Sequence, residues 1–160
     1  MREAERAAVP SPPTAISTPS ADFKGVPAMT ATPDGPRTAC WDLPPSPAVV
    51  GRARDLVREV LTTWGAAHLR HDVVLVMDEL LVNAITHGEP PIRLSVWLAS
   101  AVLCVRVTDH GDAMPRRLRL SPDALHGRGL ELIDALATAH GVTPLRDGPG
   151  KTVWARWDLS

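Results

Sequence analysis

The sequence has little of what would place it in several common protein classes. Its two cysteines, Cys40 and Cys104, are too few for a disulfide framework and lack the spacing of metal ligands. Charged residues interrupt the longest apolar stretches well short of a membrane span. No apolar run follows the charged first five residues, so a secretory signal is not expected. These absences together predict a cytoplasmic protein.

The chain also lacks an excess of charge of either sign. Lysine and arginine number 17 against 18 aspartates and glutamates, so nucleic acid and anionic membranes are not expected as partners. The six histidines include no pair four residues apart, the spacing of a helical metal site. At 160 residues the chain is long enough for one domain with a real core, but not for two.

What the sequence does contain is unevenly distributed. Ten of the 16 prolines precede Val49, where they stand among alanine, serine and threonine. Such a segment cannot bury enough apolar surface to offset the entropy lost on ordering. We therefore expect residues 1–36 to form a disordered tail and residues 37–160 to form the folded domain.

Hydrophobic periodicity then predicts the order of the elements. Apolar residues at helical spacing, ended by Gly65 and Gly88, predict the first two helices, and strict alternation afterwards predicts a hairpin. Ser46 and Pro47 are a typical start for the first of these helices. The expected elements are a strand at 38–43, helices at 46–64 and 72–87, strands at 92–98 and 102–108, a loop at 110–126, a helix at 129–139, and strands at 142–145 and 152–158. This order predicts an α/β (α+β) two-layer sandwich, with a mixed, largely antiparallel sheet and helices on one face.

The second predicted helix carries the first candidate site residues. Glu79 and Asn83 are four residues apart and therefore share one helix face. A carboxamide oxygen suits Mg²⁺, and a carboxylate beside it could orient or deprotonate an incoming hydroxyl. The alternative is an ordinary solvated edge of an amphipathic helix.

Two glycine-containing segments supply the other candidates. Asp109 ends a predicted strand, where it could accept a hydrogen bond from an adenine amino group, and Gly111 would let the backbone approach a flat ring. Gly127-Arg128-Gly129 precedes a helix whose N-terminus could meet phosphate. Each segment alone could be a simple turn or cap. The third glycine of a dinucleotide motif and the upstream glycine of a phosphate loop are both missing.

Taken in this order, the segments resemble the ATP-binding fold shared by gyrase, Hsp90, histidine kinases and MutL, the GHKL superfamily. They are most similar to its anti-sigma-factor serine/threonine kinase branch. Glu79-x-x-x-Asn83 resembles the N box, Asp109-x-Gly111 the first glycine box, and Gly127-Arg128-Gly129-Leu130 the second. The resemblance spans about residues 38 to 158.

The resemblance implies ATP and Mg²⁺ as cofactors, with Asn83 as the Mg²⁺ ligand and Glu79 as the general base. It further implies a set of residues around the nucleotide: Asn83, His87, Asp109, Gly111, Met114, Gly127, Arg128, Gly129, Leu130 and Thr152. The implied activity is phosphorylation of an antagonist protein, alternating with sequestration of a sigma factor, and a homodimer is left open.

One departure from the family pattern keeps a second function open. The first glycine box usually has a second glycine two residues on, and this chain has Ala113 there. The alternative is therefore a non-catalytic module that docks partners, with or without ATP. A histidine kinase fragment is disfavoured, because no histidine precedes Thr38 to accept a phosphoryl group.

Overall fold

A computed structural model describes residues 28–31, 36–111 and 129–159. Its elements follow the order expected from the sequence, with one additional strand at the start and a short 3₁₀ turn before the second helix. They are β1 (Ala28–Ala31), β2 (Arg37–Leu43), α1 (Val49–Thr63), η2 (Ala67–Leu69), α2 (Arg70–His87), β3 (Ile92–Ala99), β4 (Val102–Asp109), α3 (Gly129–Leu136), β5 (Ala139–Pro144) and β6 (Lys151–Asp158).

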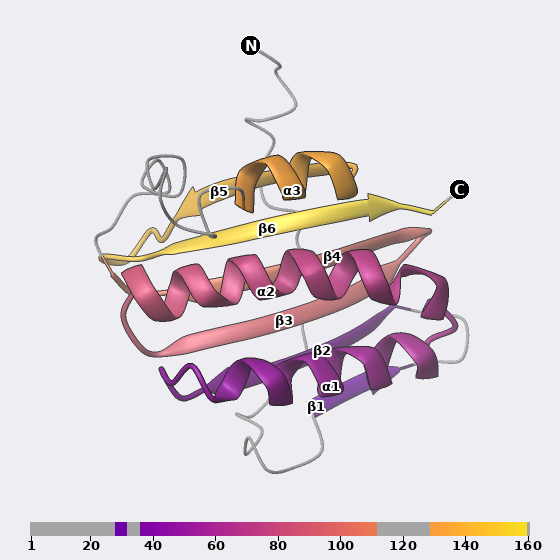
Figure 1. The fold of residues 1–160 in the computed structure, drawn as a ribbon, viewed down its shortest axis with the longest axis horizontal. Helices are drawn as coiled ribbons and strands as arrows, with labels where there is room; N and C mark the ends of the chain where they lie inside the picture. Colours follow the sequence, from indigo (N-terminus) through magenta and orange to yellow (C-terminus); the bar gives the residue numbers. More distant parts are fainter. Residues whose placement is uncertain (1–27, 32–35, 112–128, 160) are drawn as a thin grey trace.

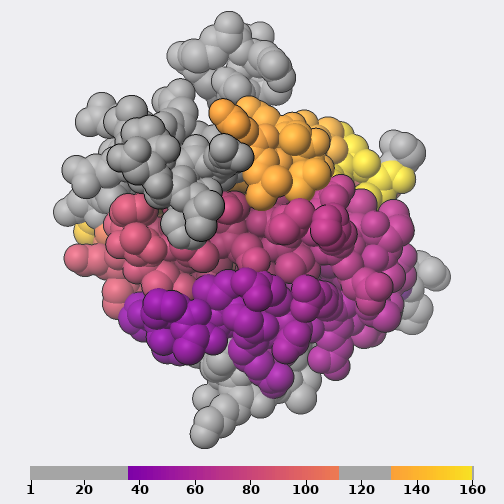
Figure 2. Space-filling view, viewed as in Figure 1, coloured from indigo at the N-terminus to yellow at the C-terminus, as the bar shows by residue number. Residues whose placement is uncertain are grey.

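The strands form one six-stranded sheet in the order β1-β2-β3-β4-β6-β5. Every pairing among these described strands is antiparallel. Helices α1, α2 and α3 all lie on the same face of the sheet (Figure 1), and Figure 2 shows them side by side on that face. The expected two-layer sandwich with helices on one face is confirmed.

The main core lies between the helices and this face of the sheet. Its members include Val57 of α1, Met77 of α2, Leu94 of β3 and Val107 of β4, none of them more than 1% exposed. Strands β2, β3, β4 and β6 contribute alternate residues to this core because successive side chains point to opposite faces. None of the described helices is long and apolar enough to cross a membrane.

The main differences from the sequence prediction concern one strand and two helix ends. Strand β1 lies within the segment expected to be a disordered tail, and it pairs with β2 from Ala28↔Cys40 to Ala31↔Arg37. An edge strand of four residues is held by backbone hydrogen bonds, which leave little trace in side-chain periodicity. The remainder of that tail, residues 1–27 and 32–35, lies outside the described residues.

The other two differences concern helix ends. Helix α1 begins at Val49 rather than at Ser46, because the Ser46 hydroxyl accepts a hydrogen bond from the Ala48 N–H (3.3 Å) within the preceding turn. Helix α3 ends at Leu136 rather than at residue 139, because Ala139 already pairs with Arg156 in the sheet. Most of the expected loop at 110–126 lies outside the described residues.

Candidate functional site

One edge of helix α2 carries three polar side chains at four-residue spacing, namely Glu79, Asn83 and His87. Asn83 is only 8% exposed, Glu79 is half-buried with one carboxylate oxygen shielded from solvent, and His87 is exposed. No hydrogen bond within the described ranges engages the Asn83 carboxamide. The carboxamide is also not among the described atoms that are fully shielded from solvent, so it is accessible and is a candidate contact for a bound ligand.

The end of strand β4 contributes a buried carboxylate. Asp109 is 2% exposed, and its Oδ1 accepts a hydrogen bond from the Gly111 N–H at 2.9 Å. Its Oδ2 accepts a second one from Nζ of Lys151 at 2.9 Å, in a salt bridge whose side chains are 2% and 9% exposed. A carboxylate offers about four lone-pair positions. Asp109 therefore keeps acceptor capacity for a ligand's amino group.

The end of α2 and the end of β4 meet closely. A Cβ added to Gly88 would lie 2.4 Å from Cγ of Asp109, and one added to Gly111 would lie 3.0 Å from the Gly88 backbone. The His110 N–H also donates to the Glu89 carbonyl at 2.8 Å. Two glycines thus allow the helix end and the strand end to touch. The C-terminal part of α2, which carries Asn83, therefore lies next to the Asp109 carboxylate, as the sequence predicts.

Thr152 does not join this group. Its hydroxyl hydrogen-bonds that of Thr108 at 2.8 Å, and both residues stand beside the pair Asp109↔Lys151 in the β4–β6 ladder. Neighbouring residues of a strand point to opposite faces, so Thr152 faces away from the helices. The prediction that Thr152 contacts the nucleotide is wrong in this arrangement. Sequence reasoning missed Lys151, which strand parity would have identified once the β4–β6 register was known.

The phosphate-binding segment is described only in part. Gly129 and Leu130 begin helix α3, which packs against α2, so the second glycine box leads into a helix as expected. Met114, Gly127 and Arg128 lie outside the described residues, and their roles remain predictions.

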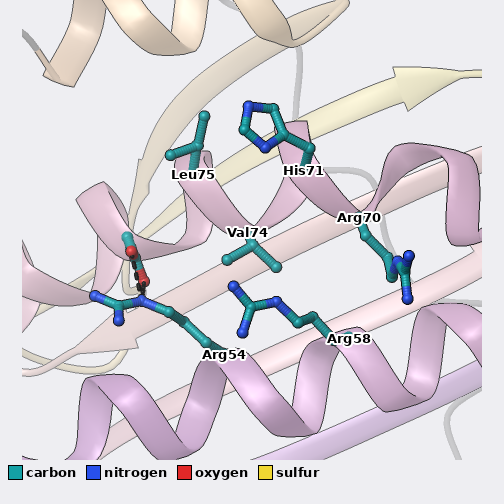
Figure 3. A pocket seen from close by; sticks show the side chains of 7 residues that line it. Arg54, Arg58, Arg70, His71, Val74 and Leu75 are labelled. Atoms are coloured by element: carbon teal, nitrogen blue, oxygen red, sulfur yellow. Dashed lines mark hydrogen bonds and ion pairs between the residues drawn. The ribbon is translucent and has the colours of Figure 1, made fainter.

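A separate surface groove of about 570 Å³ lies between α1 and α2 (Figure 3). In it, Nε of Arg54 donates to both carboxylate oxygens of Asp78, at 3.0 and 2.8 Å. Burial raises the pKa of Asp78, and the Arg54 contact opposes that rise. The full lining is Arg54, Arg58, Arg70, His71, Val74, Leu75 and Asp78. It includes neither Glu79 nor Asn83, so the groove is distinct from the candidate site.

Comparison with known protein families identifies the fold. The family model described as a histidine kinase-like ATPase domain matches residues 43–157. The chain belongs to this family. The match contains Glu79, Asn83, Asp109 and Lys151, so the candidate site lies within the matched ATPase domain. The family implies ATP as the ligand of this domain.

One solved structure has the same fold. The ATPase domain is similar to a Mycobacterium tuberculosis structure of the RsbU and RsbW domains of Rv1364c, with 22% identity and a TM-score of 0.58 over 76% of this chain and 32% of that one. It thus spans about a third of that structure. A histidine kinase domain from the Erythrobacter litoralis EL346 blue-light activated histidine kinase matches with 20% identity and a TM-score of 0.47, over 70% of this chain and 60% of that one. No curated protein matches the chain.

The residues of the ATPase domain fit a magnesium-bound nucleotide. Asp109 keeps acceptor capacity for an adenine amino group, and Asn83 offers a carboxamide oxygen with no hydrogen-bond partner in the described part of the chain. Within that part, no group of three or more histidine, cysteine, aspartate or glutamate side chains could hold a metal by itself. Mg²⁺ takes one or two protein ligands and completes its shell with waters and phosphate oxygens, and the Asn83 oxygen could be one such ligand.

Proposed function

We propose that this ATPase domain is a serine/threonine protein kinase of the anti-sigma-factor type, which phosphorylates an antagonist protein and sequesters a sigma factor. The classes of partner come from the resemblance of its motifs and from its likeness to a structure containing an RsbW domain. The proposed cofactors are ATP and Mg²⁺.

One observation carries the catalytic part of the proposal. Asn83 is buried and has no hydrogen-bond partner in the described ranges, and it stands one helical turn from Glu79, on the helix whose end touches Asp109. The Asn83 carboxamide is not among the described polar atoms that are fully shielded from solvent, so it keeps an open side in an otherwise buried position. A carboxamide oxygen held in this way is available to a metal ion or a ligand.

Each residue then has a distinct role. Asp109 accepts a hydrogen bond from the adenine amino group, and Asn83 supplies an oxygen ligand to Mg²⁺. The bound nucleotide supplies the phosphoryl group. Glu79 would orient the serine or threonine hydroxyl of the antagonist protein and accept its proton as the terminal phosphoryl group of ATP passes to that oxygen, with ADP as the leaving group. Phosphoryl transfer needs mostly positioning and electrostatic stabilisation, which three fixed side chains can provide.

The test combines nucleotide binding with phosphoryl transfer. The full chain is incubated with radiolabelled Mg-ATP and the antagonist protein that co-purifies with it from the native host. We expect label on a serine or threonine of that protein. We expect Glu79→Gln to reduce the transfer rate about 10²–10⁴-fold with unchanged ATP affinity. Asn83→Ala should lose the magnesium dependence of ATP binding.

A matched control is Glu59→Gln, because Glu59 is an exposed glutamate on α1 outside the site. This variant should transfer phosphate at the wild-type rate. The kinase assignment is wrong if the purified protein binds ATP but transfers no label, or if Glu79→Gln is as active as the control.

A second candidate function is a non-catalytic module that uses nucleotide as a structural ligand for docking partners. The Lys151 salt bridge favours it, because an ammonium group occupies one side of the Asp109 carboxylate that would receive adenine. Calorimetry distinguishes the two functions. A docking module binds partners with no label transfer, and its partner affinity is the same in wild type and Glu79→Gln.

A further inference from the structure

The groove between helices α1 and α2 lies apart from the candidate site and can hold part of another molecule. Its volume of about 570 Å³ falls within the range of about 300–1,000 Å³ that is typical of ligand-binding pockets. A phosphate or another small anion would fill only a minor part of this volume. The groove therefore suits a larger ligand.

The groove carries more positive than negative charge. Its charged lining consists of three arginines and one aspartate, which sum to +2. Arg54 is paired with Asp78 inside the groove, through contacts of 3.0 and 2.8 Å from its Nε. That pair is neutral as a whole, so the excess comes from Arg58 and Arg70. The whole chain has a net charge of −1, so this positive charge is a local feature of the groove.

The two arginines that carry this excess are available to a ligand, since both are exposed. Arg58 contacts Asp55 only at 3.5 Å, and because the two side chains are 50% and 67% exposed, this pair contributes little. Arg70 makes no ion pair within the described ranges. Figure 3 shows Arg54, Arg58 and Arg70 spread along the groove. An acidic ligand would therefore meet an available guanidinium at more than one point.

The groove also has an apolar part. Val74 lies between the two helices, where it is 5% exposed, and Leu75 of α2 is half-buried (Figure 3). Apolar side chains between two packed helices form the kind of surface on which an amphipathic helix docks. Arg54 and Arg58 are one helical turn apart, about 6 Å along α1. Acidic residues four apart on a docking helix have the same spacing.

The complementary negative charge must come from another molecule. Of the two longer segments outside the described residues, residues 1–27 hold three acidic and three basic side chains, and residues 112–128 hold two acidic and four basic ones. Neither segment is acidic. A nucleic acid fits the groove less well than a protein, because its phosphates would meet the Asp78 carboxylate and would leave the apolar side chains without a partner.

We propose that the α1–α2 groove binds an amphipathic helix of a partner protein, whose apolar residues pack on Val74 and Leu75 and whose acidic residues pair with Arg58 and Arg70. The inference goes beyond the proposed kinase activity, because no residue of the groove belongs to the nucleotide site. The groove can therefore hold a partner whether or not nucleotide is bound.

The test uses two synthetic peptides of about 18 residues, which is long enough for an isolated helix. Both carry the same stripe of leucines, flanked by glutamates in one peptide and by lysines in the other. Each is added, without nucleotide, to the isotope-labelled full chain. We expect the glutamate peptide to shift the backbone amides at 54–58 and 70–78, and the lysine peptide to leave them in place. Raising the salt concentration should weaken the binding of the glutamate peptide at least about threefold.

Charge reversal distinguishes recognition from non-specific binding. Arg58→Glu with Arg70→Glu should weaken the binding of the glutamate peptide by about tenfold or more, because attraction becomes repulsion at two positions. The same variant should bind the lysine peptide instead. Arg52→Glu is the matched control, since Arg52 is an exposed arginine of α1 that does not line the groove. It should bind the glutamate peptide within about twofold of wild type, because the reversed charge lies outside the contact.

A second measurement identifies the natural occupant. A photo-reactive amino acid replaces His71, an exposed residue of the lining, in the native host, and mass spectrometry locates the segment to which it cross-links. We expect an acidic segment with helical apolar periodicity in a different protein. The proposal is overturned if neither peptide shifts the groove amides, or if both bind equally well. It is also overturned if the cross-linked molecule is a nucleic acid, a basic segment or a second copy of this chain, or if nothing is cross-linked.

Discussion

The salt bridge between Lys151 and Asp109 gives the sharpest prediction about stability. The two groups are 2.9 Å apart and are 9% and 2% exposed. At an effective dielectric constant of 20, two unit charges at this distance attract each other by about 6 kcal/mol. Desolvation of both groups opposes this attraction, so the net value of the pair is much smaller. Removing one partner is different, because it leaves the other charge buried and uncompensated.

Lys151→Met should therefore lower the free energy of unfolding by about 3–5 kcal/mol. Asp109→Asn should cost less, for two structural reasons. Its amide oxygen can still accept the Gly111 N–H, and the lysine, on a flexible stem, can turn toward solvent. The double variant should recover much of the loss, since no uncompensated charge remains.

Urea denaturation of the four proteins at pH 7 measures this double-mutant cycle. The expected coupling free energy is at least about 1.5 kcal/mol. The reasoning is refuted if Lys151→Met costs under about 1 kcal/mol, or if the two single losses simply add. Either result would mean that the ammonium group stays hydrated in solution.

Three further predictions concern single positions. Gly88→Ala should destabilise the fold by about 1–3 kcal/mol in the same assay, because its Cβ would lie 2.4 Å from Cγ of Asp109; an unchanged denaturation midpoint would contradict this. Burial raises the pKa of the Cys104 thiol to about 12, so at pH 8 a thiol reagent followed by mass spectrometry should modify it only after denaturation. Burial also raises the pKa of Asp78 above its ordinary value of 3.8. The folded state therefore binds the carboxyl proton of Asp78 more tightly than the unfolded state does. Asp78 thus contributes more to the stability of the fold as the pH falls. Arg54→Met should therefore cost less stability near pH 4 than at pH 7, and an equal or larger cost in acid would contradict the assignment.

Local patterns in the sequence predicted much of the site. The four-residue spacing of Glu79 and Asn83 placed them on one helix edge, and the end of alternation at Asp109 placed it at the end of a strand. Both features depend on near neighbours along the chain. The three α-helices and five of the six described strands followed in the same way, since their apolar periodicity is strong.

The features that the sequence did not reveal depend on long-range pairing. Lys151 meets Asp109 only because β6 pairs with β4 in one register, across 42 residues of chain. A shift of one residue would instead have brought Thr152 to the carboxylate. Strand β1 is held by the edge of β2, and its four residues carry no periodic signal.

The central claim is that the edge of α2 and the end of β4 contact the same magnesium-bound nucleotide. Titration of the isotope-labelled chain with Mg-ATP, followed by backbone amide shifts, tests this most directly. We predict that amides at 79–87 and at 109–111 shift with one common dissociation constant, while those of Arg54 and Arg70 in the α1–α2 groove stay fixed. Shifts at only one of the two segments, or two different dissociation constants, would contradict the claim.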